Sequence, residues 1–436
     1  MTDSSTGSHR TPLRIAFVVG QFPKLSETFI VTQITGLLDR GHDVRIFSRR
    51  HTDERRHRQV DDHDLLSRTT FFGDPSGSGR VRLMDLPRTL LSHPRPGALL
   101  RTTWRRASLR RGLRTDLVRA ARILELEDQS FDIVHCHFAH NAVSILPLRR
   151  LGLLLGPLVT SFHGYDVNVV PREQGTSVYR HLFAVGDLFT ANSGFTARNV
   201  VALGCPTDRL VIQPMGIHLD EIPYAERRLP ARGPIRILTI GRLTEKKGII
   251  YALRALRKVV DRAPDVAYQI VGDGPLRPEL MDAAGKLGLD KHVIFSGWMT
   301  RSELASALAA SHLFLLPSVA AANGDVEGQG VVLQEAQAAG LPVVASRHNG
   351  FPESVPLESV PHLVAERDVD GLSARLLDLI ANPERWKDMG ERGRRFVEER
   401  FDSKKLIGKL EAIYRDLMAR GSGDHPPDRT RSSPRP

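Results

Sequence analysis

LRIAFVV, residues 13–19, is a short apolar run with strand propensity, and it breaks at Gly20. The next segment, TFIVTQITGLLDRG, carries apolar residues at helical spacing and is closed by Gly41, and DVRIFS then has the pattern of a second strand. A strand, a helix and another strand in this order predict a βαβ unit. The strand signal returns at FDIVHCHF, PLVTSFH, DLFTANS and RLVIQPMG. This alternation is typical of a parallel sheet covered by helices on both faces.

A second series of alternating elements follows the polar, proline-bearing segment 218–234, which we interpret as a linker. Its strand signals are IRILTIG, VAYQIVGDG, VIFSG, LFLLPS, PVVAS and HLVAE, and helices are expected to begin at Ile249, Arg277 and Arg301. We therefore predict an α/β chain with two Rossmann-like doubly wound domains, residues 13–217 and 235–399, facing across a cleft. Ligands of such sheets bind beyond the carboxyl ends of the strands.

The segments outside these two series are polar or basic. We expect a disordered leader at residues 1–12, a poorly ordered loop at 50–95 and a helical tail from about residue 381 to 420. The last residues, 419–436, are rich in proline, serine and arginine, which predicts a disordered tail.

The composition is that of an ordinary globular protein. The chain has 436 residues, which suits two domains, with 41% hydrophobic and 25% charged residues. Two cysteines, Cys136 and Cys205, are too few for a disulfide framework, which fits a reducing cytosol. The leader lacks the apolar core of a signal peptide, and no window approaches the roughly 20 apolar residues of a membrane span. We expect a cytoplasmic protein, with a peripheral position at the inner face of the membrane as the alternative.

The net charge of +11 is partly local. Residues 101–122, RTTWRRASLRRGLRTDLVRAAR, hold eight arginines and one acid, with leucines at helical spacing. One interpretation is a solvated amphipathic helix, and another is a surface that meets anionic lipid headgroups or an anionic acceptor. Nucleic acid is the weakest option, because no recognisable nucleic-acid-binding module accompanies the stretch. We expect no nucleic-acid partner.

Two common nucleotide fingerprints are missing from the sequence. GSGRVR (77–82), GDGPLR (272–277) and GQGVVL (328–333) each lack the last glycine of GxGxxG, and there is no GxxxxGK[ST] motif. NAD-dependent chemistry and P-loop phosphoryl transfer therefore lose support.

A glycine-rich segment with two acids, GDVEGQGVVLQEAQAAG, follows the strand LFLLPS and leads into a helix expected from about Gly330 to Ala339. The first amides of a helix lack intrahelical partners and suit a phosphate. Glu327 precedes the helix, and Glu335 lies eight residues on, about 12 Å away along a helix. That matches a sugar nucleotide, with one acid at the sugar and the other at the ribose. Alternatively, Glu335 is an ordinary surface acid, although the alanines around it indicate a packed helix.

A pair of cations follows the strand IRILTI, in GRLTEKKG (241–248). Gly241 ends the strand, and Arg242 and Lys247 flank the turn, where a fork-like guanidinium and a point-charge ammonium suit a diphosphate. We favour Lys247 over Lys246 as the ligand. The alternative is a solvated polar turn.

Histidines end two strands of the first series. His163, in TSFHGYDV, can donate to a hydroxyl or a leaving group, with Asp166 orienting it or touching the acceptor, unless it is a structural histidine. HCHFAH resembles a metal cluster, but a strand sends His135 and His137 to one face and Cys136 to the other. Three converging ligands are then hard to obtain, and we expect no metal. His137 is expected to line the acceptor side.

The stretch GQFPKLSETFI (20–30) is expected to form a loop over the cleft, with Ser26 as a helix N-cap. Its functional interpretation is a helix start that faces a negative donor, and its alternative is plain turn chemistry.

Together, the Glu-x7-Glu pair, GRLTEKKG, VGDGPL, SFHGYD and FPKLSETFI resemble family 4 retaining glycosyltransferases of the GT-B fold, in particular the exopolysaccharide and colanic-acid type. The resemblance spans residues 13–417. It implies that Arg242 and Lys247 hold a donor diphosphate, that Glu335 binds the ribose, and that the sugar meets Glu327 and His163. It further implies retention of configuration without a metal, and a last helix, about 400–418, that returns to the first domain.

The resemblance thus assigns Glu327 and His163 to catalysis. The expected donor-binding residues are Gly20, Gly241, Arg242, Lys247, Gly272, Gly328, Gln329, Gly330, Val331 and Glu335, and the expected acceptor-binding residues are Glu27, Thr28, His137 and Asp166. Departures from the family pattern at Gln329, at Gln337 and in the loop after Gly20 leave donor identity and acceptor fit open.

The sequence therefore predicts transfer of a hexosyl group, with a UDP-sugar favoured as donor, to a hydroxyl of a glycan, a lipid-linked glycan or a small molecule. No cofactor is expected beyond the donor. One alternative is an epimerase or phosphorylase of the same fold. Another is a non-catalytic protein that binds nucleotide and an anionic surface such as a membrane. Its mark would be loss of Glu327, Arg242 or Lys247, and all three are present.

Overall fold

The computed structural model describes residues 11–52, 58–72, 130–150 and 154–421. The basic stretch 101–122 and the segment 73–95 lie outside these residues, as do residues 1–10 and 422–436 of the expected leader and tail. The chain divides into two compact units. One comprises residues 1–160, 184–189 and 408–436, and the other comprises residues 161–183 and 190–407.

The first predicted series forms a seven-stranded sheet with the strand order β3-β2-β1-β4-β5-β6-β7. β1 pairs in parallel with β2 and with β4, and β2 pairs in parallel with β3, as predicted. The strands are β1 (Arg14–Phe22), β2 (Asp43–His51), β3 (Thr69–Phe71), β4 (Ile133–His137), β5 (Leu158–Phe162), β6 (Leu188–Ala191) and β7 (Leu210–Ile212).

Two expectations for this half are wrong. The first strand does not end at Gly20, because β1 continues to pair with β2 through Phe22 and His51. The loop expected at 50–95 contains α2 (Arg58–Asp62) and β3, because Thr69, Thr70 and Phe71 pair with β2 and extend the sheet.

The helices of this half occupy the predicted intervals. They are α1 (Thr28–Asp39), α6 (Ala139–Arg150), α7 (Tyr165–Asn168), α8 (Val170–Gln174), α9 (Arg180–Val185) and α10 (Gly194–Ala202), with 3-10 turns at Leu25–Glu27, Thr176–Tyr179 and Thr207–Arg209. Gly41 has φ +85° and follows the end of α1, as predicted. Ser26 is not a helix N-cap: it lies inside the first 3-10 turn, and Glu27 precedes α1 without a side-chain cap.

The last helix, α17 (Ser403–Gly421), is anchored by its second half. Glu411 accepts a hydrogen bond from Arg40 at 2.7 Å, and the Tyr414 hydroxyl lies 2.5 Å from Nδ1 of His135. Residues from Gly408 onward therefore belong to the compact unit that contains β1 and β4.

The second series forms a five-stranded sheet with the order β10-β9-β8-β11-β12. The strands are β8 (Ile235–Ile240), β9 (Val266–Val271), β10 (Val293–Gly297), β11 (Leu313–Leu316) and β12 (Val343–Ala345). The predicted strand HLVAE is wrong: only Val364 makes an isolated bridge, to Ser346, because the segment enters a turn at once.

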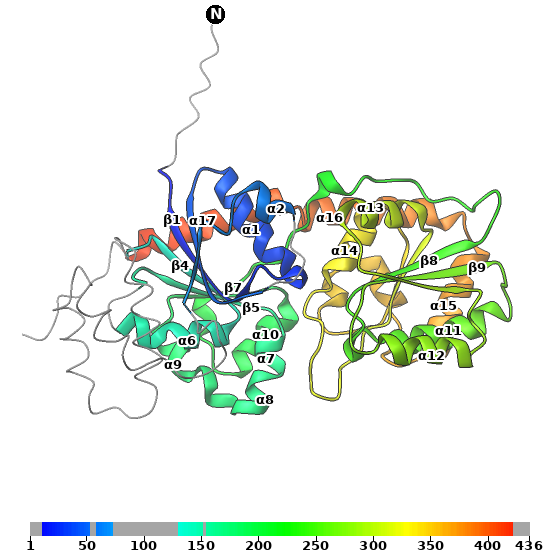
Figure 1. The fold of residues 1–436 in the computed structure, drawn as a ribbon, viewed down its shortest axis with the longest axis horizontal. Coiled ribbons are helices and arrows are strands. Elements are labelled where there is room, and N and C mark those ends of the chain that lie inside the picture. The colour runs from blue at the N-terminus through cyan, green and yellow to red at the C-terminus, as the bar shows by residue number, and fades with distance from the viewer. Residues whose placement is uncertain (1–10, 53–57, 73–129, 151–153, 422–436) are drawn as a thin grey trace, which may run out of the picture. The chain divides into compact units, whose positions relative to one another are not determined.

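Two helical layers cover this sheet, as Figure 1 shows: α11 (Ile249–Val260), α12 (Arg277–Lys286) and α15 (Val369–Ala381) lie on one side, and α13 (Arg301–Ala310), α14 (Val331–Ala338) and α16 (Arg385–Arg400) on the other. Alternate residues of β8 belong to two separate apolar clusters. Ile237 packs with the α11 side and the fully buried Trp386, and Leu238 packs with Leu333 on the α14 side. Both faces of β8 are therefore buried, as its continuous apolar run predicts.

Hydrogen bonds hold the predicted linker at Ile222, Ala225 and Arg227. After a 3-10 turn at Leu219–Glu221, Arg227 is only 5% exposed. Its Nη1 donates to the carbonyls of Ala309 (2.7 Å) and Ser311 (3.1 Å), and its Nη2 donates to that of Ala339. Because a buried guanidinium needs acceptors, this contact fixes the segment against the ends of α13 and α14.

Candidate active site

Glu327 lies in the loop between β11 and α14, next to two lysines. Its carboxylate is 3.3 Å from Lys247 Nζ and 3.6 Å from Lys246 Nζ. Burial opposes ionisation of Glu327, but the two ammonium groups outweigh it and lower the pKa of this carboxyl to about 2. Glu327 is therefore a carboxylate at neutral pH.

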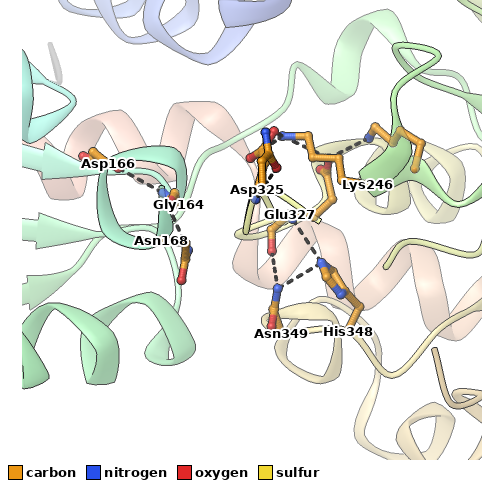
Figure 2. Close-up of polar contacts among 10 residues, drawn as sticks. Gly164, Asp166, Asn168, Lys246, Asp325, Glu327, His348 and Asn349 are labelled. Atoms are coloured by element: carbon orange, nitrogen blue, oxygen red, sulfur yellow. Dashed lines mark hydrogen bonds and ion pairs between the residues drawn. The ribbon is translucent and has the colours of Figure 1, made fainter. Parts of the chain in front are cut away.

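Lys246 joins the same cluster, which the sequence interpretation had placed second to Lys247. Its Nζ also lies 3.2 Å from Asp325, and Figure 2 shows both residues beside Glu327. Burial alone would lower the pKa of Lys246, but Glu327 and Asp325 reverse the effect and raise it. The cluster holds two cations against two anions, and Lys247, only 8% exposed, is its most buried cation.

The turn that supplies both lysines depends on glycines. Gly241 ends β8, and a Cβ there would lie 2.8 Å from Lys247 Cε. Gly272 has φ +126°, and a Cβ there would lie 2.0 Å from the Gly241 carbonyl oxygen. Only glycine fits these positions without rearrangement. Arg242 follows Gly241 and is exposed, so its guanidinium is accessible.

The start of α14 is equally close-packed. Gly330 has φ +73° and precedes the first helical residue, Val331, and a Cβ on it would meet the Phe351 ring at 2.5 Å. A Cβ at Gly328 would lie 2.6 Å from the His163 carbonyl oxygen. The predicted helix and its glycine-rich entry are confirmed.

Gln329 has a different role from the one expected of a ligand contact. Its amide both donates to and accepts from the backbone of Met215, each at 2.8 Å, and it also donates to Gln334. The side chain is 2% exposed. The side chain holds the loop in place, so a contact of residue 329 with the sugar nucleotide would have to come from its backbone.

Glu335 lies on α14 with its side chain 15% exposed, 3.3 Å from Arg301 Nη1. Burial raises the pKa of Glu335, and Arg301 compensates only in part. Arg301 is shared, because its Nε also binds Glu221 of the 3-10 turn before the linker. The ionised form of Glu335 is thus destabilised by burial and is only partly stabilised by Arg301, whose side chain is 39% exposed.

His163 follows β5 directly, in the turn that Asp166 orders. The Asp166 carboxylate accepts from the backbone amides of His163 (3.0 Å) and Gly164 (3.1 Å), and Gly164 has φ +125°. Asp166 is fully buried, and Figure 2 shows it directed at the turn that carries Gly164. These bonds orient the backbone of His163. A direct contact of Asp166 with acceptor stays a prediction.

His135 and His137 share a face of β4, as the strand period predicts, and their rings stack with centroids 4.4 Å apart. Burial lowers the pKa of His135 to about 3, so this ring is neutral. His137 is fully buried and also stacks on Phe17. Within the described part of the chain, no three His, Cys, Asp or Glu residues converge in metal-site geometry.

The residues expected near the end of β1 lie in three different elements, namely β1, a 3-10 turn and α1. Gly20 lies within the strand, and a Cβ on it would meet Asn141 Oδ1 at 3.2 Å. Glu27 accepts from Lys24 at 2.8 Å, and Thr28 begins α1. Their acceptor-side roles stay predictions.

Three residues that the sequence interpretation missed surround Glu327. His348 Nε2 accepts from the Glu327 backbone amide at 3.0 Å, and Asn349 donates to the Glu327 carbonyl at 3.3 Å. Glu366 in turn lies 2.5 Å from His348 Nδ1. A signal was present for the first two, because His348 and Asn349 follow PVVAS at the carboxyl end of β12.

Comparison with known proteins places this geometry in a family. The model for "Glycosyltransferase Family 4" matches residues 26–221, and that for "Glycosyl transferases group 1" matches residues 224–396. The Escherichia coli protein WcaL, assigned to colanic acid biosynthesis, is 30% identical over 413 residues, which are 93% of this chain and 100% of WcaL. The amylovoran biosynthesis glycosyltransferase AmsK of Erwinia amylovora is 32% identical over 377 residues, 84% of this chain and 90% of AmsK.

This chain belongs to glycosyltransferase family 4.

Solved structures agree on the fold of this family 4 glycosyltransferase. Anabaena HepE, in a complex with UDP and glucose, superposes with a TM-score of 0.65 over 93% of this chain and 100% of its own, at 16% identity. The predicted GT-B architecture of two Rossmann-like domains is thereby confirmed, as is the predicted resemblance to exopolysaccharide enzymes through WcaL and AmsK. The chain is a glycosyltransferase. Among the described helices, none combines the length and hydropathy that crossing a bilayer requires.

Proposed function

We propose that this enzyme transfers a hexosyl group from a UDP-sugar, with retention of configuration, to a hydroxyl of a growing polysaccharide or its lipid-linked precursor. The observation that carries the proposal is the ionised, buried Glu327 held between Lys246 and Lys247 at the carboxyl end of β11. The UDP of HepE and the exopolysaccharide assignments of WcaL and AmsK support the donor and acceptor classes.

In this proposal, residues 235–399 hold the donor and residues 13–217 with the last helix hold the acceptor. Arg242, Lys247 and the first amides of α14, from Gly328 to Val331, neutralise the departing diphosphate. Gly241 and Gly272 lack side chains, so the nucleotide can approach the backbone of this turn closely. Glu335 binds the ribose hydroxyls. Gly20 completes the donor side, and Glu27, Thr28, His137 and Asp166 belong to the acceptor side.

Glu327 and His163 act at the sugar in this proposal. The Glu327 carboxylate accepts hydrogen bonds from sugar hydroxyls and stabilises the positive charge that develops at the anomeric carbon. Its partner Lys247 then moves from the carboxylate toward the diphosphate, so the donor replaces one ion pair with another. His163 donates to a sugar hydroxyl near the reaction centre. No step requires a metal.

Thermal stability against UDP, GDP, dTDP and ADP tests the donor class. A ligand at about 100 times its dissociation constant adds roughly 2.7 kcal/mol, which moves the melting temperature by several degrees. We expect UDP to give the largest shift. A larger shift with GDP would replace UDP in the proposal, and no shift with any of them would contradict nucleotide binding by the free protein.

Alanine at Lys247 or at Arg242 tests the diphosphate role. Each substitution removes a positive charge that would stabilise the departing diphosphate. We therefore expect turnover of the sugar nucleotide to fall about 100-fold or more. Circular dichroism checks that each variant is folded. Near-normal turnover would remove that residue from the role. Isomerised donor or phosphate-dependent release among the wild-type products would instead indicate an epimerase or a phosphorylase.

We also propose that the enzyme works at the inner face of the membrane, where the arginines of residues 101–122 meet anionic headgroups. The positive charge of the chain supports this placement.

A further inference from the structure

The His348 ring has polar neighbours of opposite character on its two nitrogens. Nε2 faces two N–H donors, the Glu327 backbone amide at 3.0 Å and the Asn349 side-chain amide at 2.9 Å. Nδ1 faces the Glu366 carboxylate at 2.5 Å. Two donors require Nε2 to be an unprotonated acceptor, and the carboxylate requires a proton on Nδ1. The surroundings therefore select one neutral tautomer.

Asn349 fixes its own orientation in this arrangement. Its Nδ2 donates to the Glu327 carbonyl at 3.3 Å, so a flipped amide would set two oxygens against each other. The peptide groups on both sides of the Glu327 Cα are thus held, the amide by His348 and the carbonyl by Asn349. Figure 2 shows both residues below the Glu327 backbone, on the side opposite Lys246.

Glu366 ties the same loop at its other end. Its second oxygen accepts from the Ala320 amide at 2.8 Å, just after β11. The next residue, Arg367, donates to the Ala320 carbonyl at 2.6 Å. His348 itself is fully buried and packs edge-on against Phe351, whose ring also limits Gly330 to glycine. Hydrogen bonds therefore hold the loop that carries Glu327 at two places, at Ala320 and at Glu327 itself.

We propose that His348 and Glu366 are a positioning pair that fixes the backbone of Glu327, so that its carboxylate meets the donor sugar in one geometry. The inference rests on the proposed donor-sugar role of Glu327. Neither residue touches the substrate. Glu366 holds the ring as the Nδ1–H tautomer, and the ring then accepts from the Glu327 amide.

The charges around the ring are consistent with a neutral histidine. Burial lowers the pKa of His348 and Lys247 adds to this effect, while Glu366 and Glu327 oppose it without reversing it. Protonation would place a second N–H against the Glu327 amide and break the bond that holds the loop.

The tautomer can be measured without any activity. In 15N-histidine-labelled protein at mildly alkaline pH, we expect the His348 ring, assigned by its loss in His348→Gln, to give the nitrogen shifts of the Nδ1–H form. In Glu366→Ala we expect that preference to be lost. An Nε2–H or cationic ring in the wild type would overturn the inference.

His348→Gln and His312→Gln form a matched pair for the catalytic consequence. Both rings accept a backbone amide in the same sheet domain, His312 from Arg236 at 2.9 Å, but Arg236 lies at the amino end of β8. With UDP-glucose as probe, we expect His348→Gln to lower kcat about 10- to 100-fold, the effect of a displaced catalytic group. UDP affinity should stay nearly constant. His312→Gln should change only the melting temperature.

The conservative variant completes the test. Glu366→Gln keeps one oxygen that can accept from Nδ1–H, although its NH2 group then faces the Ala320 amide. We therefore expect it to retain more of kcat than Glu366→Ala, which should resemble His348→Gln. Unchanged kcat in His348→Gln, or equal losses in Glu366→Gln and Glu366→Ala, would contradict a positioning pair. If the wild type consumes neither UDP-glucose nor any other sugar nucleotide, the proposed function fails, and the tautomer measurement still decides the geometry of the loop.

Discussion

Glu327 and Glu335 flank the start of one helix, yet their pKa values move in opposite directions. Both carboxyls are desolvated, so the difference comes from their partners. Glu327 has two lysines within 4 Å, while Glu335 has one arginine that it shares with Glu221. The folded protein therefore stabilises the charge of Glu327 and disfavours that of Glu335.

Glu335→Gln should separate stability from nucleotide binding. Because the pKa of Glu335 is raised above 4.5 by folding, its ionised form destabilises the protein above that pH, and glutamine removes this penalty. We expect an unchanged or higher melting temperature at pH 7, together with a loss of about 1.5–3 kcal/mol in UDP binding, the value of a hydrogen bond to a charged group. Calorimetric titration measures the second quantity.

The control for this variant is Glu279→Gln, which changes an exposed acid on α12 and should leave UDP affinity unchanged. Unchanged UDP affinity in Glu335→Gln would remove the ribose role.

The pH dependence of turnover should report His348. Its pKa lies below 6.5, so the ring is neutral at pH 7 and gains a proton as the pH falls below 6.5, which breaks its bond to the Glu327 amide. Glu327 titrates near pH 2 and cannot cause a loss in that range. Glu335, whose pKa is raised, also gains a proton in acid, so we expect kcat to fall on the acid side in the wild type and to fall less steeply in His348→Gln. If kcat of the variant falls at low pH as it does in the wild type, the fall is caused by another group.

Much of the candidate site could be predicted at the residue level, because its side chains follow strands at their carboxyl ends. Glu327, Arg242 and His163 all occupy such positions. The hydrogen bonds that hold the backbone around these residues could not be predicted. Glu366 is 39 positions from Glu327 by their residue numbers and follows a single β-bridge rather than a strand. Gln329 had the position of a ligand contact, but its amide pairs with the backbone of Met215, a partner that no local pattern indicates.

Among the elements, α14 depends on a glycine at its entry. Gly330→Ala adds a Cβ at φ +73°, at 2.5 Å from the Phe351 ring. Gly204 supplies a matched control, because it also has positive φ (+98°) but nothing within 4 Å of an added Cβ. We expect Gly204→Ala to lose roughly 1–2 kcal/mol of stability from backbone strain alone.

Gly330→Ala should lose more stability than Gly204→Ala and should also weaken UDP binding, because the displaced backbone carries the first amides of the helix. Chemical denaturation and UDP titration of both variants measure these effects. Equal stability losses and equal UDP affinities would show that the Phe351 contact relaxes without cost.

The α17 helix contributes a second, pH-dependent anchor. Burial alone would raise the pKa of Glu411, but hydrogen bonds from Arg40 and Arg415 lower it to about 2. A carboxyl with a depressed pKa stabilises the fold above its unfolded value of 4.5 and loses that contribution as the pH falls toward 2. Glu411→Gln should therefore lower the melting temperature at pH 7 and flatten its decline in acid.

For comparison, Glu398→Gln removes a more exposed ion pair with Arg394 and should have little effect on either property. If both variants behave alike across the pH range, α17 is not anchored through Glu411.

Helices were predicted more accurately than strand ends. The start of α11 at Ile249, of α12 at Arg277 and of α13 at Arg301 all match, because a turn signal precedes each one. Strand limits depend on pairing with a distant neighbour. The β1 strand continues past Gly20 only because residues of β2 lie beside it, and HLVAE stays a turn because only Val364 finds a partner.

At the scale of the whole molecule, the net charge of +11 has a measurable consequence. Each arginine near an anionic membrane surface contributes about 1 kcal/mol, and salt screens the attraction. We expect co-sedimentation with phosphatidylglycerol vesicles at low salt, its loss at high salt, and its reduction when Arg105, Arg106, Arg110 and Arg111 are replaced by glutamine. Equal binding to neutral vesicles would contradict an electrostatic attachment.

The repeated rhythm of strands and helices made the two-domain architecture predictable. The division of the chain into compact units was less so, because residues 161–183 belong to a different unit from the strands β1 to β4 that precede them. Sequence periodicity describes neighbours along the chain, whereas a compact unit depends on contacts between distant residues.

The buried Arg227 also bears on the construction of hybrid enzymes. Exchanging residues 235–399 between relatives invites a junction in the polar segment 218–234. The Arg227 guanidinium, however, satisfies carbonyls of Ala309, Ser311 and Ala339, and Ala225 donates to the same Ala339 carbonyl. A junction placed after residue 227 would inherit this arginine from one parent and its acceptors from the other. Grafts joined ahead of Tyr224 keep the set together and should yield more folded chimeras.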